Sequence, residues 1–167
     1  MSCEELPVNC DLEWDEHLHK SGYLKELCEK YGIGLPKGET MFSGCIVFTV
    51  YNEQGVKVAY YGYRIKDMQP VFHKSFNPEL YLYNYHNIDI TQPVYLTTSL
   101  HFWLVIVRDI DPNAIAVFDL PYLSARQLNL LREIPGITFF GPKEEINPLI
   151  AQADKFLENY LHIFKKK

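Results

Sequence analysis

The spacing of hydrophobic and polar positions changes along the chain, and each pattern predicts a different kind of element. Apolar residues recur at helical spacing within residues 12–31, which predicts one helix that ends at Gly32. Residues 45–65 begin and end with runs of β-branched and aromatic side chains around an Asn-Glu-Gln-Gly turn, so we expect an antiparallel hairpin there. Residues 66–78 contain two prolines and predict a loop, and residues 80–84 predict a short strand or an ordered turn.

Strand-like and helix-like segments alternate from Pro93 onward. A small parallel sheet with right-handed crossovers is the expected result of such alternation. The fold class is therefore α/β with an α+β amino-terminal part, in which an antiparallel hairpin subdomain precedes a small parallel sheet flanked by helices. The predicted strands are 94–98, 114–118 and 137–140, and the predicted helices are 99–108, 124–134 with Ser124 as N-cap, and Asn147 to Phe164 with Asn147 as cap.

We place the division between the two parts at residue 90. The first part, residues 1–90, has an acidic helical lead (1–35) and then the hairpin, and the second part is residues 91–167. No run approaches the ~20 apolar residues of a membrane span, and the acidic start lacks a signal-peptide pattern. We therefore expect a cytoplasmic protein without a membrane association, and its four cysteines (Cys3, Cys10, Cys28, Cys45) as reduced thiols.

The distribution of charge is uneven, although the net charge is only −5. Residues 1–29 hold eight acidic residues and two lysines, so the remainder of the chain is close to neutral. Within that remainder, Lys57, Arg64, Lys66 and Lys74 form a local basic window. The window is a weak footprint for nucleic-acid binding, and ordinary solvated strand edges would give the same pattern.

Three stretches of the chain together resemble the catalytic core of bacterial-type DNA primases. The first is YGIGLPKGETMFSGCIVFTVYNEQGVKVAYYGYRI (31–65), the second is FHKSFNPELYLYNYH (72–86), and the third is the strand–helix alternation of 94–141. The first two are similar to the amino-terminal half of that core, and the third resembles Toprim, the metal-binding nucleotidyl-transfer module of primases and topoisomerases. The resemblance covers roughly residues 23–160 and does not include the zinc-binding module of full primases.

The residues that the resemblance ties to catalysis are replaced. The Glu-Gly that ends the first Toprim strand corresponds to Thr98 and Ser99, and the Asp-Gly-Asp after the third strand falls in Gly141-Pro142-Lys143-Glu144-Glu145. Because two-metal phosphoryl transfer needs clustered carboxylates, the resemblance implies a degenerate site. Glu144 and Glu145 are weak metal candidates, since the acidic first turn of the last helix explains them as well.

The basic residues of the family are also mostly missing. Cys45 stands where the resemblance places a strand arginine, 69–71 replace a Lys-Tyr-Lys run, and Pro78 replaces another lysine. Arg64 matches a basic position of the family, and Lys74 is near one but not aligned with it.

Two functions remain open. The first is a non-catalytic primase-like module that acts as a binding or interaction scaffold in DNA replication or a mobile element. Such a module needs no cofactor, and its partner would be another protein, a second copy of itself or weakly held single-stranded nucleic acid. The alternative is an active Mg²⁺-dependent enzyme on nucleotides or nucleic acid with relocated carboxylates. These carboxylates would come from Asp109, Asp111, Asp119, Glu144 or Glu145.

Asp119 is the most informative of these candidates. It follows the predicted strand 114–118, and ligands of open α/β sheets bind at the carboxyl ends of strands. The simpler interpretation is a turn residue in Asp-Leu-Pro. An eroded gene product that only folds is a third possibility.

Overall fold

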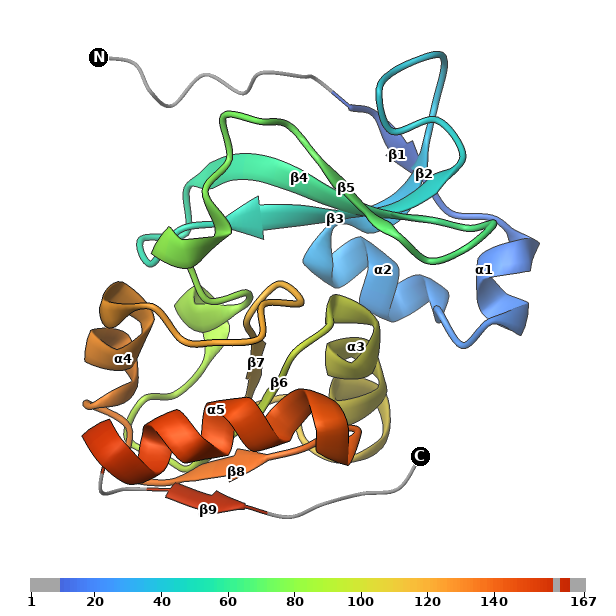
Figure 1. Cartoon of the computed structure of the whole chain (residues 1–167). Coiled ribbons are helices and arrows are strands. Elements are labelled where there is room, and N and C mark those ends of the chain that lie inside the picture. The colour runs from blue at the N-terminus through green and yellow to red at the C-terminus, as the bar shows by residue number, and fades with distance from the viewer. Residues whose placement is uncertain (1–9, 158–159, 163–167) are drawn as a thin grey trace. The chain divides into compact units, whose positions relative to one another are not determined.

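A computed structural model describes residues 10–157 and 160–162. The chain divides into two compact units, one ending at Phe76 and the other beginning at Asn77 (Figure 1). None of the helices in these described ranges is long and apolar enough to cross a membrane.

The first unit is built on a five-stranded antiparallel sheet whose strands are neighbours in sequence order, β1-β2-β3-β4-β5. The predicted hairpin is confirmed as β3 and β4, which pair from Cys45↔Arg64 to Tyr51↔Lys57. The predicted loop at 66–78 is wrong in part, because β5 lies within it and pairs with β4. Its proline is tolerated because it is the first residue of an edge strand. The strands are β1 (Leu12–Glu13), β2 (Ile33–Pro36), β3 (Cys45–Tyr51), β4 (Lys57–Arg64) and β5 (Pro70–Phe72).

The single helix expected over residues 12–31 is wrong. The chain instead forms strand β1 and two short helices, α1 (Glu16–Lys20) and α2 (Lys25–Tyr31). The break falls at Gly22, which has a positive φ of 90°, and Tyr23 beside it is buried and accepts a hydrogen bond from Trp14 Nε1 through its carbonyl. The expected end at Gly32 is confirmed, because Gly32 caps α2 in the left-handed conformation.

Both faces of the central strands in the first unit are covered. On one face, Cys45 and Val47 pack with Phe42 and Tyr60, and Gly62 permits this approach because a Cβ there would lie 3.1 Å from Phe42 and from Cys45. The other face is aromatic, and its rings contact one another edge-on or stacked: Tyr23, Phe48, Tyr61, Tyr63, Phe72 and Phe76.

The second unit is a parallel sheet with the strand order β7-β6-β8-β9. The predicted strand–helix alternation and the α/β fold class are confirmed. The strands are β6 (Val94–Thr97), β7 (Ala114–Ala116), β8 (Ile137–Phe139) and β9 (Tyr160–His162), and the helices are α3 (Leu100–Asp109), α4 (Ala125–Leu131) and α5 (Lys143–Phe156). Ser124 caps α4 as expected.

The last helix differs from its prediction at both ends. It begins at Lys143 and not at Asn147, because the carbonyl of Pro142 already accepts from two backbone N–H groups of the first turn. Pro148 therefore lies inside α5. The helix stops at Phe156, and β9 follows where helix was expected, while Phe164 lies outside the described residues.

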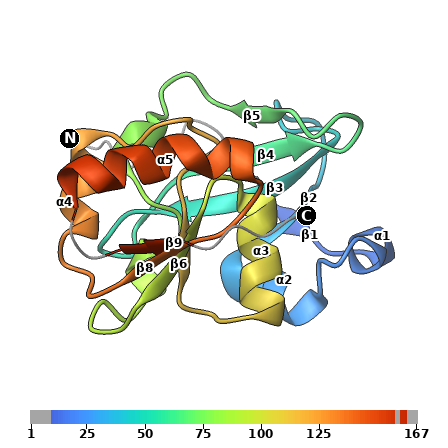
Figure 2. The same ribbon diagram turned by 60° about the horizontal axis from the view of Figure 1, so that its bottom comes forward.

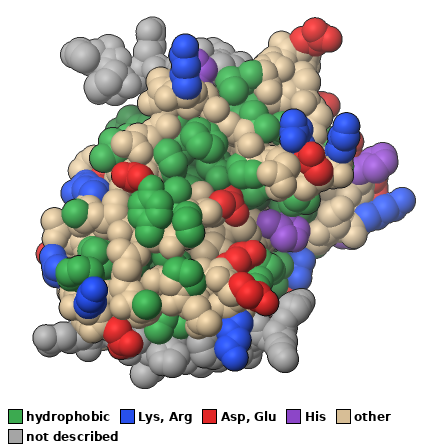
Figure 3. Space-filling model, in the orientation of Figure 1, with side chains coloured by type: hydrophobic (Ala, Val, Ile, Leu, Met, Phe, Trp, Pro, Cys, Tyr) green, Lys and Arg blue, Asp and Glu red, His purple; other side chains and the backbone are tan. Residues whose placement is uncertain are grey.

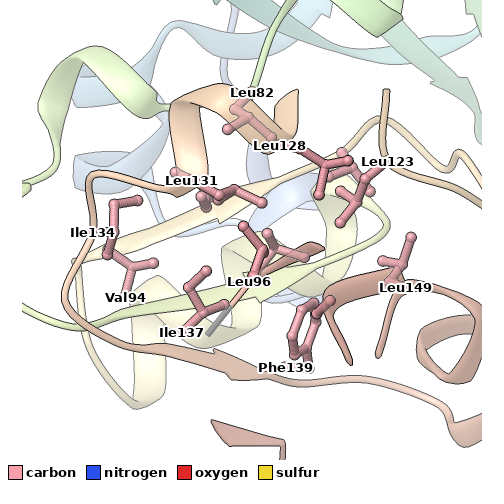
Figure 4. Close-up of a cluster of buried hydrophobic side chains, with 14 of the residues drawn as sticks. Leu82, Val94, Leu96, Leu123, Leu128, Leu131, Ile134, Ile137, Phe139 and Leu149 are labelled. Carbon is pink, nitrogen blue, oxygen red and sulfur yellow. The ribbon is translucent and has the colours of Figure 1, made fainter. Parts of the chain in front are cut away.

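Residues 77–90, which we grouped with the amino-terminal part, pack with the second unit. They contain two 3₁₀ turns, η1 (Pro78–Leu80) and η2 (Tyr85–Asn87). Between them, Leu82 enters the core and Tyr83 forms a bridge to Ala116 of β7. Figure 4 shows this core between the strands, α4 and α5.

Helices cover both faces of the parallel sheet (Figure 2). Helices α4 and α5 supply residues to the cluster of Figure 4, whereas α3 packs on β6 and β7 with its own buried residues, including Trp103. Strand β6 comes first in the chain of the second unit but lies between β7 and β8.

Candidate functional site

A pocket of about 270 Å³ lies in the second unit, at the carboxyl ends of the parallel strands. The chain leaves β6 for β7 on one side and later returns to β8 on the other, so the strand order reverses at β6. In open α/β sheets, a crevice at this position is where ligands bind. The lining comes from the segments after β6, β7 and β8: Thr98, Asp119, Leu120, Pro121, Glu144, Glu145 and Pro148.

The two residues after β6 have structural partners. The hydroxyl of Thr98 donates to Oε1 of Glu145 at 2.7 Å, which ties the end of β6 to the first turn of α5. The hydroxyl of Ser99 accepts from the backbone N–H of Phe102 at 3.0 Å and caps α3. Ser99 therefore acts as the N-cap of α3 and is not among the residues that line the pocket.

The segment after β7 is strained. Phe118 and Asp119 are consecutive non-glycine residues with φ of 59° and 62°, a conformation that a bulky side chain rarely adopts. Two features hold it: Phe118 is buried, and the N–H of Asp119 donates to the carbonyl of Thr98 at 2.7 Å. The exposed Asp119 side chain is thereby placed on the pocket wall.

Gly141, the second residue after β8, is a poor position for a carboxylate side chain. Gly141 has a φ of 144°, and a Cβ there would lie 3.2 Å from Oγ1 of Thr97. An aspartate at this residue would therefore be strained and crowded. Glu144 and Glu145 lie in the first turn of α5, as the simpler interpretation predicted, and both also line the pocket.

The five carboxylates of the enzyme alternative divide into two groups. Asp119, Glu144 and Glu145 share the pocket. Asp109 pairs with Arg108 at the carboxyl end of α3, and Asp111 accepts from the backbone N–H of Asn113, so neither belongs to this lining. In residues 10–157 and 160–162, no group of three or more His, Cys, Asp or Glu side chains is arranged to hold a metal ion.

The four residues of the basic window do not form one patch. Lys57 and Arg64 begin and end β4, about 23 Å apart at ~3.3 Å per residue. Arg64 makes two hydrogen bonds to the carboxylate of Asp67, from Nε at 3.2 Å and Nη2 at 3.1 Å. Lys66 and Lys74 are exposed in the turn before β5 and in the segment after it.

Cys45, where the resemblance implies an arginine, is directly opposite Arg64 in the hairpin. Cys45 is buried, and burial raises the pKa of its thiol, while the charge of Arg64 opposes that shift. The hairpin therefore presents one paired guanidinium where the resemblance implies two basic side chains. Cys10 and Cys28 are also buried free thiols, and Cys3 lies outside the described residues.

Sequence reasoning missed the apolar part of the pocket. Leu120, Pro121 and Pro148 complete its lining. The Asp-Leu-Pro run after a buried strand was a signal for the first two. Pro148 carried no such signal, because it was expected beside a helix cap.

Comparisons with known proteins identify the fold. No protein-family model matches the sequence, and no curated protein sequence matches it. Among solved structures, the Aquifex aeolicus primase (zinc-binding and RNA polymerase domains) is similar with a TM-score of 0.65 at 15% identity, over 93% of this chain and 44% of that one. A DnaG primase catalytic domain bound to ssDNA has a TM-score of 0.61 at 14% identity, over 95% and 59% of the two chains.

The RNA polymerase domain of Mycobacterium tuberculosis primase DnaG is similar as well, with a TM-score of 0.59 at 12% identity over 95% of this chain and 62% of that one. This chain thus spans about half the length of these primase structures. At such identities the likeness shows the fold alone, and the expected fold resemblance is confirmed.

Proposed function

We propose that this chain, which has the fold of the bacterial primase catalytic core, is a non-catalytic primase-like module that acts as a binding or interaction scaffold in DNA replication or in a mobile element. The observation that carries the proposal is the presence of Thr98 directly after β6. This is the position where the resemblance places a metal-binding glutamate, and the Thr98 hydroxyl is bonded to Glu145. Binding partners of this module are another protein, a second copy of the chain, or weakly held single-stranded nucleic acid.

The chemistry of phosphoryl transfer supports this proposal. Mg²⁺ ions that bridge phosphate oxygens need several carboxylate oxygens directed at one point. At this site one of the three carboxylates accepts from Thr98, and Gly141 cannot be replaced by aspartate without strain. The fold is kept, while Thr98 and Gly141 stand where the resemblance implies carboxylate positions, which is compatible with a binding role.

One observation favours the enzyme alternative. Asp119, Glu144 and Glu145 come from two separate segments, and the fold brings them to one pocket. Rearrangement of these side chains around Mg²⁺ would give a metal site that differs from the family pattern.

Thermal unfolding with and without Mg²⁺ separates the two functions. A site with a Kd of about 1 mM would stabilise the chain by about 1.4 kcal/mol at ~10 mM Mg²⁺. We expect no such stabilisation. A rise in Tm that is lost in Glu144→Gln but kept in the matched surface variant Asp154→Asn would refute the non-catalytic proposal, because it would place a metal in this pocket.

Binding of a fluorescent single-stranded oligonucleotide at low salt, with and without Mg²⁺, tests the nucleic-acid partner. Phosphate contacts are strongest under these conditions. Because Arg64 is paired with Asp67, we expect Arg64→Ala to change any affinity by less than about threefold, as should the control Arg132→Ala on the second unit. Binding that strengthens with Mg²⁺ and falls selectively in Arg64→Ala would instead indicate a residual primase-like site.

A further inference from the structure

The pocket at the carboxyl ends of the parallel strands has two chemically different parts. Leu120, Pro121 and Pro148 give it an apolar part, and the side chains of Asp119, Glu144 and Glu145 give it an acidic part. No lysine or arginine is among the described residues that line it. Figure 3 shows acidic side chains gathered over the amino-terminal end of α5. This charge disfavours phosphate groups and attracts cations.

Glu144 is the pocket carboxylate that is most available to a ligand. Its side chain is exposed and makes no hydrogen bond or ion pair to any residue in the described part of the chain. Glu145 keeps acceptor capacity beyond its bond from Thr98, since a carboxylate offers about four lone-pair sites.

One wall of the pocket is formed by Leu120 and Pro121, and hydrogen bonds of the residues that follow them hold it in place. The N–H and carbonyl of Leu123 bond to the side-chain amide of Gln152 on α5, at 2.6 and 3.0 Å. The hydroxyl of Tyr122 donates to the carboxylate of Glu79, and that of Ser124 donates to the Glu79 carbonyl at 2.6 Å. A wall fixed in this way loses little conformational entropy when a ligand binds.

Two exposed apolar residues lie close to this wall. Tyr122, which follows Pro121 in the chain, is 39% exposed, and Leu80, which follows the Glu79 bonded to the Tyr122 hydroxyl, is 46% exposed. Apolar surface next to the carboxylates of Glu144 and Glu145 is complementary to a chain segment that alternates basic and apolar side chains.

We propose that this pocket docks a short segment of a partner protein in which a lysine or arginine neighbours a leucine-like residue. The cationic side chain enters between Glu144 and Glu145, and the apolar neighbour packs on Pro121 and Pro148. The cavity of about 270 Å³ is smaller than the ~300–1,000 Å³ of typical small-molecule sites, which suits one or two side chains better than a whole cofactor. This inference rests on the scaffold function and names the chemistry of its partner.

The test is an NMR titration of the ¹⁵N-labelled full chain with the peptide acetyl-Leu-Arg-Leu-Lys-amide. Two matched peptides isolate the contributions, acetyl-Leu-Gln-Leu-Gln-amide without charge and acetyl-Gly-Arg-Gly-Lys-amide without apolar side chains. We expect saturable shifts at the amides of Leu120 and Glu144 with the first peptide and clearly weaker binding of both controls. Raising the salt concentration should weaken binding, because the carboxylates are solvent-accessible.

Variants of the chain give the sharper comparison. Glu144→Gln should weaken binding by about threefold, and the double change of Glu144 and Glu145 to Gln by about tenfold, as expected for partly exposed ion pairs. Asp154→Asn, on the same helix but outside the lining, should leave affinity within about 1.5-fold. Leu120→Ser should also weaken binding, with its folding checked by the unshifted remainder of the spectrum.

Three results would overturn the inference: no saturable binding of the basic peptide, equal binding of the uncharged peptide, or affinity unchanged in Glu144→Gln. A parallel Mg²⁺ titration keeps this outcome distinct from failure of the scaffold function. If Mg²⁺ gives saturable shifts at the same amides that Glu144→Gln abolishes, the pocket is a metal site and both proposals fail. If neither Mg²⁺ nor the peptide binds, the inference about the partner fails alone.

Discussion

Replacing Thr98 with valine tests the hydrogen bond that joins β6 to α5. The change keeps the branched shape of a side chain that is 3% exposed and removes the hydroxyl that donates to Glu145. A hydrogen bond to a charged group contributes about 1.5–3 kcal/mol, and one between neutral groups about 1 kcal/mol. Because Glu145 is exposed and can be rehydrated, we expect the free energy of unfolding to fall by about 1–1.5 kcal/mol.

The assay is urea unfolding of four chains in a double-mutant cycle: wild type, Thr98→Val, Glu145→Ala and the double variant. The cycle should give a coupling energy of about 1 kcal/mol, with unchanged m-values. Thr138→Val on β8 is the matched control. Thr138 is half-buried and has no side-chain hydrogen bond to the described residues, so its replacement should change stability by less than about 0.5 kcal/mol.

A coupling energy below about 0.3 kcal/mol would refute this reasoning, since that is the scatter expected for independent sites. Glu145 would then be available for other ligands, and the case for a relocated metal site would strengthen. A coupling energy of about 1 kcal/mol would instead show that Thr98, which follows β6, stabilises the fold through Glu145.

Three further changes probe the fold. Gln127→Leu should cost about 3 kcal/mol in urea unfolding, because the buried Gln127 amide donates to two backbone carbonyls of residues 78–81 that would lose their partner. Gly32→Ala should lower the free energy of unfolding by at least about 1 kcal/mol more than Gly38→Ala does. Both glycines have a positive φ, but a Cβ at Gly32 would lie 2.9 Å from Oγ1 of Thr49, whereas a Cβ at Gly38 would meet nothing within 4 Å. Burial raises the pKa of the Cys28 thiol from 9.0 to about 11, so the folded state favours the protonated thiol. The folded state's preference for the protonated thiol contributes fully to stability below pH 9. This contribution, up to about 2–3 kcal/mol, should be lost as the pH rises to 11. Unfolding measured at both ends of this range should show a smaller loss in Cys28→Ala, and an equal loss would contradict the assignment.

Local patterns in the sequence were sufficient for the elements that form from neighbouring residues. The β3–β4 hairpin closes through a short turn, and Ser124 caps α4 as predicted. The wrong predictions concern elements that form only through pairing with residues outside their own segment. Strand β1 exists because Leu12 pairs with Pro36, and β5 exists because its residues pair with β4, and neither pairing leaves a periodic signal in so short a segment.

The site was predictable in position but not in its interactions. Thr98 and Asp119 follow predicted strands, so their place at the carboxyl ends of the sheet could be expected. The bond between Thr98 and Glu145 spans 47 residues, and the positive φ of Phe118 breaks the usual preference of a bulky residue. Both depend on the packed structure. The pairing of Arg64 with Asp67, only three residues apart, was visible in the sequence and weakens the basic window.

The position of β6 between strands that follow it in the chain has a consequence for synthesis on the ribosome. Strand β6 is complete at Thr97, but its neighbours begin at Ala114 and Ile137. At about 5–20 residues per second, the growing chain carries one unpaired edge of β6 for about 2–8 seconds before β8 emerges. During that interval Val94 and Leu96, which are buried in the finished protein, lack their cover. A message truncated before residue 137 would leave that edge open permanently, and its product should be a substrate for chaperones and proteases.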